Sequence, residues 1–193
     1  MDPVTLTTGR LLLRTVGPQD TDVVYAAAQD PEIQRWTTIP VPYLPEHARS
    51  FTDQLVPEGW ANGSMLTWGL FLPEGEELVG MLSLTMRTLG AAEIGFWGAG
   101  RHRGRGYVTE AVLAVARWAF TDLCLDRVEW RAEVGNTASR AVAERAGFVI
   151  EGVMRSAIIH RGARRDCWVG ALLPSDLALP STAPYLPAPV QPA

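Results

Sequence analysis

The chain of 193 residues contains no lysine, because all 17 of its basic residues are arginine. A Walker-type phosphate loop and a protein kinase each need a lysine against the phosphates, and a pyridoxal phosphate enzyme needs one for its Schiff base. The absence of lysine therefore excludes these three classes of enzyme.

Cysteine and histidine are scarce. Cys124 and Cys167 form no CxxC pair, and His47, His102 and His160 are scattered without the spacing of metal ligands. We therefore expect no metal site and no structural disulfide. Cys124 lies in a short apolar segment and is predicted to be buried in the core.

Long hydrophobic runs are also absent. Runs such as Ala111–Ala116 are far shorter than the ~20 apolar residues of a membrane-spanning helix, and the acidic, polar start of the chain is not that of a signal peptide. We therefore expect a cytoplasmic protein without a membrane partner. The net charge of −4 argues against nucleic-acid binding by the surface as a whole.

The remaining composition is typical of one globular domain. Hydrophobic residues make up 47% of the chain and charged residues 20%, which suits a single core at this length. The composition changes after residue 173, because residues 174–193 are rich in proline and carry one acid and no base. We therefore predict a domain of residues 1–173 followed by a proline-rich tail, 174–193.

Hydrophobic periodicity predicts an α/β (α+β) fold, with a mixed central sheet of about seven strands flanked by helices. The predicted strands are 10–16, 65–72, 77–87, 91–97, 127–134, 148–154 and 166–173. The predicted helices are 20–28, 46–55, 106–120 and 136–146. Residues 31–45 are predicted to be mostly loop, and Pro73-Glu74-Gly75-Glu76 to be a hairpin turn.

The segment Glu93–Glu110 (EIGFWGAGRHRGRGYVTE) carries the clearest chemical signal. A strand ends in a glycine-rich loop that leads directly into the most regular helix. Glycines let backbone amides approach an anion, the helix N-terminus adds unsatisfied N–H groups, and three arginines add charge. The segment therefore predicts a pyrophosphate-binding loop rather than a glycine-rich turn with solvated arginines. It is not a dinucleotide fingerprint, because its glycines are spaced GxGxxxG.

These residues resemble a known family. Arg101-x-x-Gly104-x-Gly106 is similar to the acyl-CoA pyrophosphate loop of the GNAT acyltransferase superfamily. The chain also resembles the ribosomal-protein N-terminal acetyltransferase branch of that superfamily. The matching residues are Asn136-Thr137-Ala138-Ser139, Gly147-Phe148, Glu151-Gly152, Thr8–Arg14 and Arg165-Asp166. The resemblance spans about residues 8 to 174. It implies a GNAT-like domain splayed around an acyl-CoA site, which transfers an acyl group to a primary amine by direct attack in a ternary complex.

The resemblance also implies a cofactor site for acetyl-CoA or another short-chain acyl-CoA, without a metal. The pyrophosphate would bind the glycine-rich loop, and the pantetheine arm would lie along the preceding strand. The cofactor-binding residues implied are Phe96, Trp97, Arg101, His102, Arg103, Gly104, Arg105, Gly106, Tyr107, Asn136, Ser139 and Arg140.

Acyl transfer to an amine needs two catalytic groups. A base takes the proton of the ammonium group, and an acid protonates the leaving thiolate. Glu93 is predicted to be the base, because it precedes the splay that the resemblance implies and strand alternation puts it on one face with Gly95 and Trp97. A solvent-facing strand glutamate is the alternative, and Glu133, Asp166 or a water relay would also serve. The superfamily's tyrosine acid is replaced by Ala143, and Ser139 stands where the ribosomal-type branch brings a serine near the thiol.

The acceptor is expected to be a peptide N-terminus or a small amine. One or two of the aromatic residues Trp36, Tyr43, Trp60 and Trp68 are expected to line its cleft. A second arginine cluster, Arg155, Arg161, Arg164 and Arg165, flanks the last predicted hairpin. It would read an acidic acceptor, face a partner in a homodimer of the kind the family often forms, or lie in solvent.

Two other functions stay open at this point. The first is an acyl-CoA sensor that keeps the fold without turnover. The second is an RNA-binding surface built on the arginine-rich loop, which would lose affinity steeply with salt. Stacking aromatics are sparse near that loop, with Tyr107 the one close by.

Overall fold

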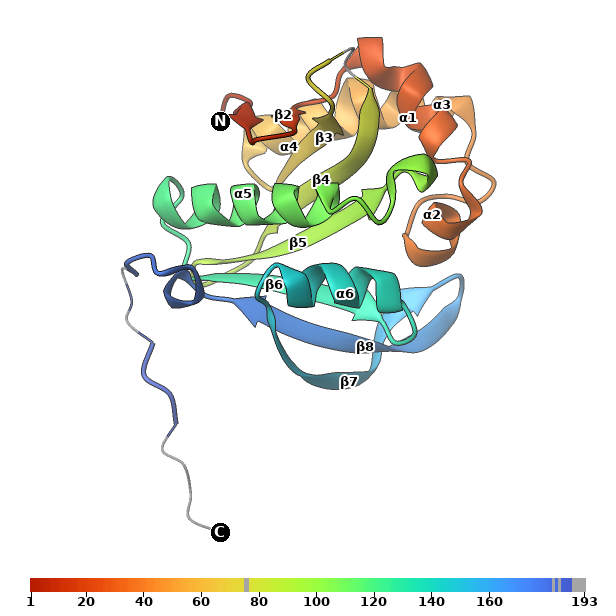
Figure 1. Ribbon diagram of the computed structural model, residues 1–193. Helices are drawn as coiled ribbons and strands as arrows, with labels where there is room; N and C mark the ends of the chain where they lie inside the picture. The colour runs from red at the N-terminus through yellow and green to blue at the C-terminus, as the bar shows by residue number, and fades with distance from the viewer. Residues whose placement is uncertain (75–76, 182, 184, 189–193) are drawn as a thin grey trace.

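The structure is a computed structural model that describes residues 1–74, 77–181, 183 and 185–188. Its central feature is an eight-stranded mixed sheet in the order β1-β2-β3-β4-β5-β6-β8-β7 (Figure 1). The strands are β1 (Leu6–Thr7), β2 (Leu12–Arg14), β3 (Met65–Phe71), β4 (Leu78–Met86), β5 (Ala91–Gly98), β6 (Arg127–Glu133), β7 (Val149–His160) and β8 (Ala163–Leu172). The strand beyond the seven predicted is β1, whose two residues are too few to show a period.

The helices lie between these strands. They are α1 (Thr21–Ala27), α2 (Pro31–Trp36), α3 (Pro45–Ser50), α4 (Val56–Asn62), α5 (Tyr107–Thr121) and α6 (Thr137–Arg145). Shorter helical segments are η1 (Pro18–Asp20), the π-helical η2 (Phe51–Leu55), η3 (Gly100–His102) and η4 (Pro174–Leu177).

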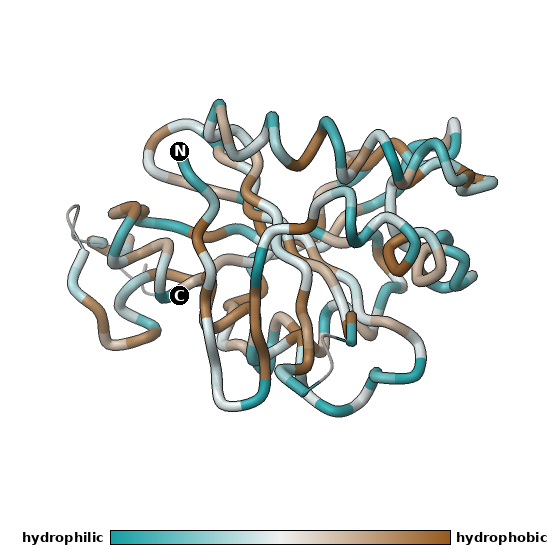
Figure 2. The backbone as a smooth tube through the Cα atoms, turned by 90° about the horizontal axis from the view of Figure 1, so that it is seen from above, coloured by the Kyte–Doolittle hydropathy of each residue, from teal (hydrophilic) through white to brown (hydrophobic). Residues whose placement is uncertain are grey.

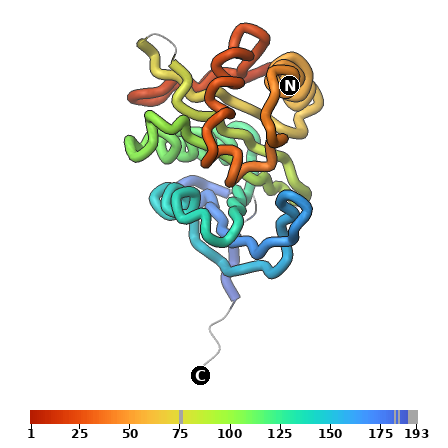
Figure 3. Tube along the Cα trace, turned by 90° about the vertical axis from the view of Figure 1, so that its right-hand side faces the viewer, coloured from red at the N-terminus to blue at the C-terminus, as the bar shows by residue number. Residues whose placement is uncertain are grey.

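The sheet is divided where β5 meets β6. Neighbouring strands are antiparallel except this pair, which is parallel. Their pairing starts at Ala91 with Arg127 and ends at Ile94 with Trp130, although both strands continue beyond it. The strands therefore diverge toward their carboxyl ends, which confirms the expected splay. Figure 3 shows the two parts, with the red-to-green part of the chain above the teal and blue part.

Helices cover the sheet on both faces. In Figure 1, α5 and α6 lie in front of the strands and α4 is seen behind them. The helix predicted at residues 106–120 packs an apolar face on the sheet, since Val112, Val115 and Ala119 of α5 are fully buried and Val108 is partly buried. Hydrophobic segments run through the central strands in Figure 2, while polar segments dominate the periphery.

Two segments differ from the predicted elements. Residues 31–45 contain α2, which begins because the Asp30 carboxylate accepts hydrogen bonds from the amides of Glu32 and Ile33, with Pro31 in the first turn. The second predicted helix, 46–55, was expected to end before Pro57 and does not. That proline lies in the first turn of α4, where a missing N–H costs little, so helical structure continues.

Other boundaries also differ. The last hairpin is longer than predicted, because β7 extends to His160 and β8 begins at Ala163. Cys124 is exposed rather than buried, since it lies in the turn after α5 with a φ of +52°. In the predicted turn 73–76, residues 75 and 76 lie outside the described part of the chain.

The end of the chain starts with the single turn η4. Leu177 and Leu179 pack against the core, and the Ser181 hydroxyl donates to the Asp126 carboxylate at 2.8 Å. The division at residue 173 stays a prediction. Within the described residues, none of the helices has the length and apolar character needed to span a membrane.

Candidate active site at the divergence of β5 and β6

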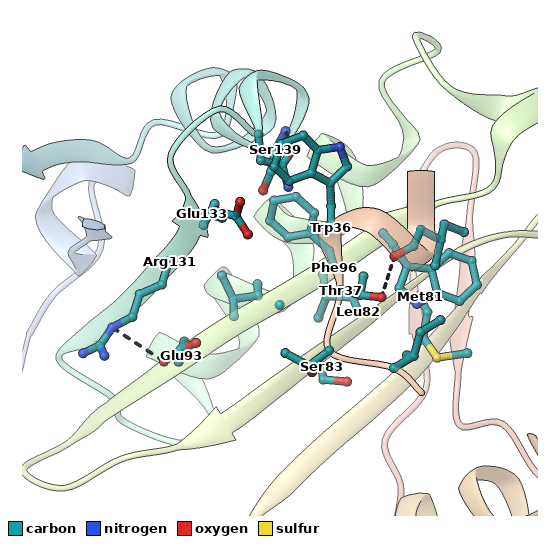
Figure 4. Close-up of a pocket in the computed structure, with 18 of the residues that line it drawn as sticks. Trp36, Thr37, Met81, Leu82, Ser83, Glu93, Phe96, Arg131, Glu133 and Ser139 are labelled. Atoms are coloured by element: carbon teal, nitrogen blue, oxygen red, sulfur yellow. Dashed lines mark hydrogen bonds and ion pairs between the residues drawn. The ribbon is translucent and has the colours of Figure 1, made fainter. Parts of the chain in front are cut away.

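A cavity of about 540 Å³ opens where β5 and β6 separate. On β5, Ile94 and Phe96 line it together with Glu93, Gly95 and Trp97. Because successive strand residues point to opposite faces of a sheet, the cavity reaches both faces. A ligand entering beside α5 and α6 can therefore meet a second ligand from the opposite face. Figure 4 shows Ser139 next to α6, with Glu93 and Glu133 along the strands.

The glycine-rich loop follows β5 and forms one end of the site. Gly104 and Gly106 have φ of +76° and +79°, and no atom lies within 4 Å of where a Cβ at Gly104 would stand. The first hydrogen bond of α5 runs from the Glu110 amide to the Gly106 carbonyl, so the amides of Tyr107–Thr109 have no acceptor within the helix. This open backbone fits a pyrophosphate.

The arginines of the loop differ in their surroundings. Arg101 forms an ion pair with Glu77 at 2.5 Å, and Arg103 with Asp30 at 2.9 Å. His102 is buried, with Nε2 3.2 Å from the Glu77 carboxylate. Arg105 is exposed and forms no ion pair with any residue that the structure describes. Of the three guanidinium groups, that of Arg105 is therefore the one available to a phosphate.

The N-terminus of α6 forms the opposite wall. The Asn136 side chain caps the helix by accepting the Ser139 amide, as the cap interpretation predicted. The Trp130 indole N–H donates to the Ser139 hydroxyl oxygen at 3.0 Å. Arg140 lies apart from these groups, because it pairs with Glu144 at 2.8 Å and stacks on Trp168. Asn136, Ser139 and Trp130 line the cavity.

Glu93 lies on the other face of the sheet, at the end of a row of alternating charges. Its carboxylate is 2.9 Å from Arg87 and 3.7 Å from Arg131. Arg131 also pairs with Glu129, and the row continues across the sheet through Arg127 to Glu151. Glu93 is a quarter exposed and lines the cavity, whereas Glu129 does not line it.

Glu133 belongs to a partly buried cluster that the sequence did not predict. Its carboxylate accepts from Arg35 of α2 at 2.9 Å and lies 2.9 Å from His160 Nδ1 at the end of β7. Because a carboxylate only accepts, Nδ1 carries the hydrogen. The bond from Arg35 lowers the pKa of Glu133, burial opposes this, and His160 lowers it further. Asp30-Pro31 signals the helix that carries Arg35, whereas no local signal marks His160.

The lowered pKa of Glu133 predicts a pH-dependent contribution to stability. Its folded-state pKa lies below the unfolded value of 4.5, so the cluster stabilises the fold above that pH and loses its effect as the pH falls through the folded-state pKa. Glu133→Gln is expected to lower the free energy of unfolding by about 1–2 kcal/mol near neutral pH. Urea unfolding at several pH values checks this. A loss that is the same in acid would contradict the assignment.

The aromatic residues separate into two groups. Trp36 and Tyr43 line the cavity, in agreement with the expectation that one or two would, and burial raises the pKa of the Tyr43 phenol. Trp60 and Trp68 are fully buried in the core. Asp166 does not line the cavity, and one of its carboxylate oxygens accepts the Ser156 amide.

Within the described residues, no group of three or more histidine, cysteine, aspartate or glutamate side chains has the geometry to hold a metal ion. The polar groups around the cavity are instead arginine, carboxylate, hydroxyl and amide side chains, one histidine and backbone amides. These groups suit an anionic cofactor and a nucleophilic amine.

Comparison with known proteins agrees with this geometry. The family model described as "Acetyltransferase (GNAT) domain" matches residues 10–149. The N-acetyltransferase p20 of Bacillus licheniformis, itself uncharacterised, is 29% identical over 90% of this chain and 98% of its own. The ribosomal-protein-serine acetyltransferase of Escherichia coli K12 is 33% identical over 47% of this chain and 52% of its own. The structure of Mycobacterium smegmatis RimJ with CoA-disulfide superimposes with a TM-score of 0.79, at 26% identity, over 92% of this chain and 88% of that one.

The chain therefore belongs to the GNAT acetyltransferase family. It is an N-acetyltransferase that takes the acetyl group from acetyl-CoA, as the motifs implied, and its fold is the single α/β GNAT fold. The comparisons give no support to a non-catalytic acyl-CoA sensor.

Proposed function

We propose that the protein acetylates the α-amino group of a ribosomal protein in the cytoplasm. The observation that carries the proposal is the cavity that reaches both faces of the sheet, because it lets an extended peptide end approach from the face opposite the cofactor. The relative named as a ribosomal-protein-serine acetyltransferase supports the choice of acceptor.

The loop after β5 would hold the cofactor. In the proposed complex, the amides of Tyr107–Thr109 and the Arg105 guanidinium bind the pyrophosphate, and the open backbone at Gly104 lets it approach. The β5 edge that has lost its β6 partner, near Phe96 and Trp97, offers backbone groups to the pantetheine arm and the thioester carbonyl. When bound, acetyl-CoA supplies the activated acyl group.

The roles of the remaining predicted loop and helix residues are indirect. Arg101, His102 and Arg103 hold the loop against Glu77 and Asp30. Asn136 fixes the start of α6 through its cap. Arg140 pairs within α6 and would reach the cofactor only by leaving Glu144.

Glu93 is the proposed base and Ser139 the proposed acid. Glu93 lines the acceptor side of the cavity, whereas both oxygens of Glu133 are bound by Arg35 and His160. Ser139 accepts a hydrogen bond from Trp130, so its own O–H hydrogen stays available for the leaving thiolate. Glu93 would take the first proton, from the ammonium, before attack. The second proton, which the nitrogen loses as the amide forms, would replace the one that Ser139 gives to the thiolate, so that the serine ends as a neutral hydroxyl.

The proposed acceptor is tested by incubating purified bacterial ribosomal proteins with the enzyme and acetyl-CoA, followed by mass spectrometry of each N-terminus. The proposal expects one or a few ribosomal proteins to gain an acetyl group on the α-nitrogen. Acetylation confined to lysine side chains or to small amines, with every N-terminus unmodified, would refute it.

Gly104→Ala is expected to weaken binding of acetyl-CoA about tenfold, because the new methyl group stands where the anion approaches and the backbone there is left-handed. Isothermal titration measures this. Gly63→Ala is a matched control, since Gly63 also has a positive φ (+71°) and open space at its Cβ. The two variants should lose similar stability, and equal affinity for acetyl-CoA in both would show that the loop is not the cradle.

A homodimer is also proposed, as the family resemblance implied. The long strand β7 lies at the edge of the sheet, and Val149, Val153 and Ile159 on it are exposed. An edge strand with apolar side chains favours association. Light scattering during size-exclusion chromatography tests this, and a monomer at all concentrations would exclude it.

A further inference from the structure

The hairpin formed by β7 and β8 borders the acceptor side of the cavity. Ala157, Ile158 and His160 of β7 line it. At the tip of the hairpin, the Arg161 guanidinium donates to the backbone carbonyl of Gln34 in α2. A peptide whose amino end lies in the cavity would therefore pass alongside this hairpin.

Four arginines stand on this hairpin, and we name Arg155, Arg161, Arg164 and Arg165 the hairpin arginines. All four are exposed. Arg165 pairs in register with Ile158, so both side chains lie on the same face of the sheet. Its guanidinium is 4.0 Å from the Glu133 carboxylate, which Arg35 already binds. Arg165 and Arg161 thus stand at the edge of the cavity.

The hairpin arginines differ from most other arginines of the chain in their partners. Nine arginines in the described residues form closer ion pairs with carboxylates, namely Arg10, Arg14, Arg35, Arg87, Arg101, Arg103, Arg127, Arg131 and Arg140. Arg161 and Arg164 instead donate to backbone carbonyls. Residues 155–166 carry four arginines and one acid, Asp166, a formal charge of +3, in a chain whose net charge is −4.

We infer that the hairpin arginines select acceptors with acidic residues just after the acetylated amino group, an inference that rests on the proposed function. Among the described residues, Arg155, Arg161 and Arg164 form no ion pair with a carboxylate, and the ion pair of Arg165 with Glu133 is long, at 4.0 Å. Exposed guanidinium groups of this kind attract carboxylates over about a Debye length, roughly 8–10 Å at physiological salt. The acidic side chains of the acceptor would pair with arginines that outnumber the acids of residues 155–166 four to one. Basic residues at the same positions are repelled, so the cluster discriminates as well as binds.

Three short peptides with the same first two residues test the inference. Their following residues are acidic, neutral or basic. At low salt, kcat/KM is expected to be about tenfold higher for the acidic than for the basic peptide, with the neutral one between them. Added salt should reduce this ratio, because the contacts are exposed.

The variant R161Q/R165Q removes two hairpin charges while glutamine keeps a hydrogen-bond donor at each position. R117Q/R145Q is the matched control, because these arginines are exposed on α5 and α6 and form no ion pair among the residues that the structure describes. The net charge becomes −6 in both variants (−4 − 2). The acidic-to-basic ratio should fall toward one in the hairpin variant alone. The neutral peptide and the unfolding midpoint of each variant report any general damage.

Each outcome decides the inference. A ratio near one in the wild-type protein, with all three peptides acetylated, overturns it and leaves the proposed function intact. Acetylation of small amines but of no peptide overturns both. If the acidic-to-basic ratio of kcat/KM falls equally in both variants, the preference comes from the net charge of the protein and the inference is overturned. Salt-sensitive binding of an RNA oligonucleotide that R161Q/R165Q abolishes, beside an unchanged peptide ratio, makes the cluster a nucleic-acid surface instead.

Discussion

Glu93→Gln is expected to lower kcat for amine acetylation by about 10²–10⁴-fold, the usual contribution of a positioned base, while binding of acetyl-CoA changes little. Glutamine keeps the shape of the side chain and a hydrogen-bonding oxygen for Arg87 and Arg131, but it cannot take the ammonium proton. Steady-state rates with a saturating peptide and isothermal titration of acetyl-CoA separate the two effects. The loss should shrink as the pH rises and more of the acceptor amine is already neutral.

Glu129→Gln is the matched control for this variant. Glu129 contacts the same Arg131 on the same face of the sheet, yet it does not line the cavity. It tests whether the row of ion pairs, rather than proton transfer, sustains the rate. Equal losses in both variants would remove Glu93 from the role of base and leave a water relay to be considered.

Trp68→Ala is expected to lower the free energy of unfolding by about 3–5 kcal/mol. The indole is fully buried and packs edge-on against Trp60 at 4.9 Å and Trp118 at 5.5 Å. It also donates to the Val4 carbonyl at 2.7 Å, a bond that alanine cannot make. Removing the ring leaves a cavity between α4, β3 and α5, and the unfolding midpoint should fall by about 2–4 °C per kcal/mol.

Trp36→Ala serves as the control for side-chain size. This indole is half-buried at the edge of the cavity, where it covers the Arg35 guanidinium and donates to Glu32. Its loss should cost clearly less stability but change the KM of the acceptor. If the two variants were equally destabilised, the core would not be centred on the tryptophans of α4, β3 and α5.

The glycine-rich loop and the start of α6 were predictable because their signals are local. Gly104 and Gly106 adopt left-handed backbone, which glycine favours. Asn136 caps a helix by binding the amide of Ser139, and the two residues lie within four positions of the chain. The same holds for the apolar stripe of α5. In each case the residues that interact are neighbours in the sequence, so periodicity and capping rules apply directly.

The acceptor side was less predictable because its contacts are distant in sequence. Arg35, Glu133 and His160 meet only after α2, β6 and the last hairpin are in place. Pro-rich composition concealed α2, although Asp30 and Pro31 mark its start. The extra length of β7 depends on its pairing with β8, whose register is irregular. The hydrophobic periodicity of β7 alone therefore does not predict where the strand ends.

Mass spectrometry of the protein mixed with acetyl-CoA and an N-terminally free peptide tests the central claim most directly. That claim is that the acetyl group passes straight from acetyl-CoA to an amine within the cavity between β5 and β6. We predict an acetyl group on the peptide α-nitrogen, none on the protein, and no transfer when the peptide N-terminus is blocked. An acetylated protein that forms with acetyl-CoA alone and then passes its acetyl group to the peptide would contradict the account.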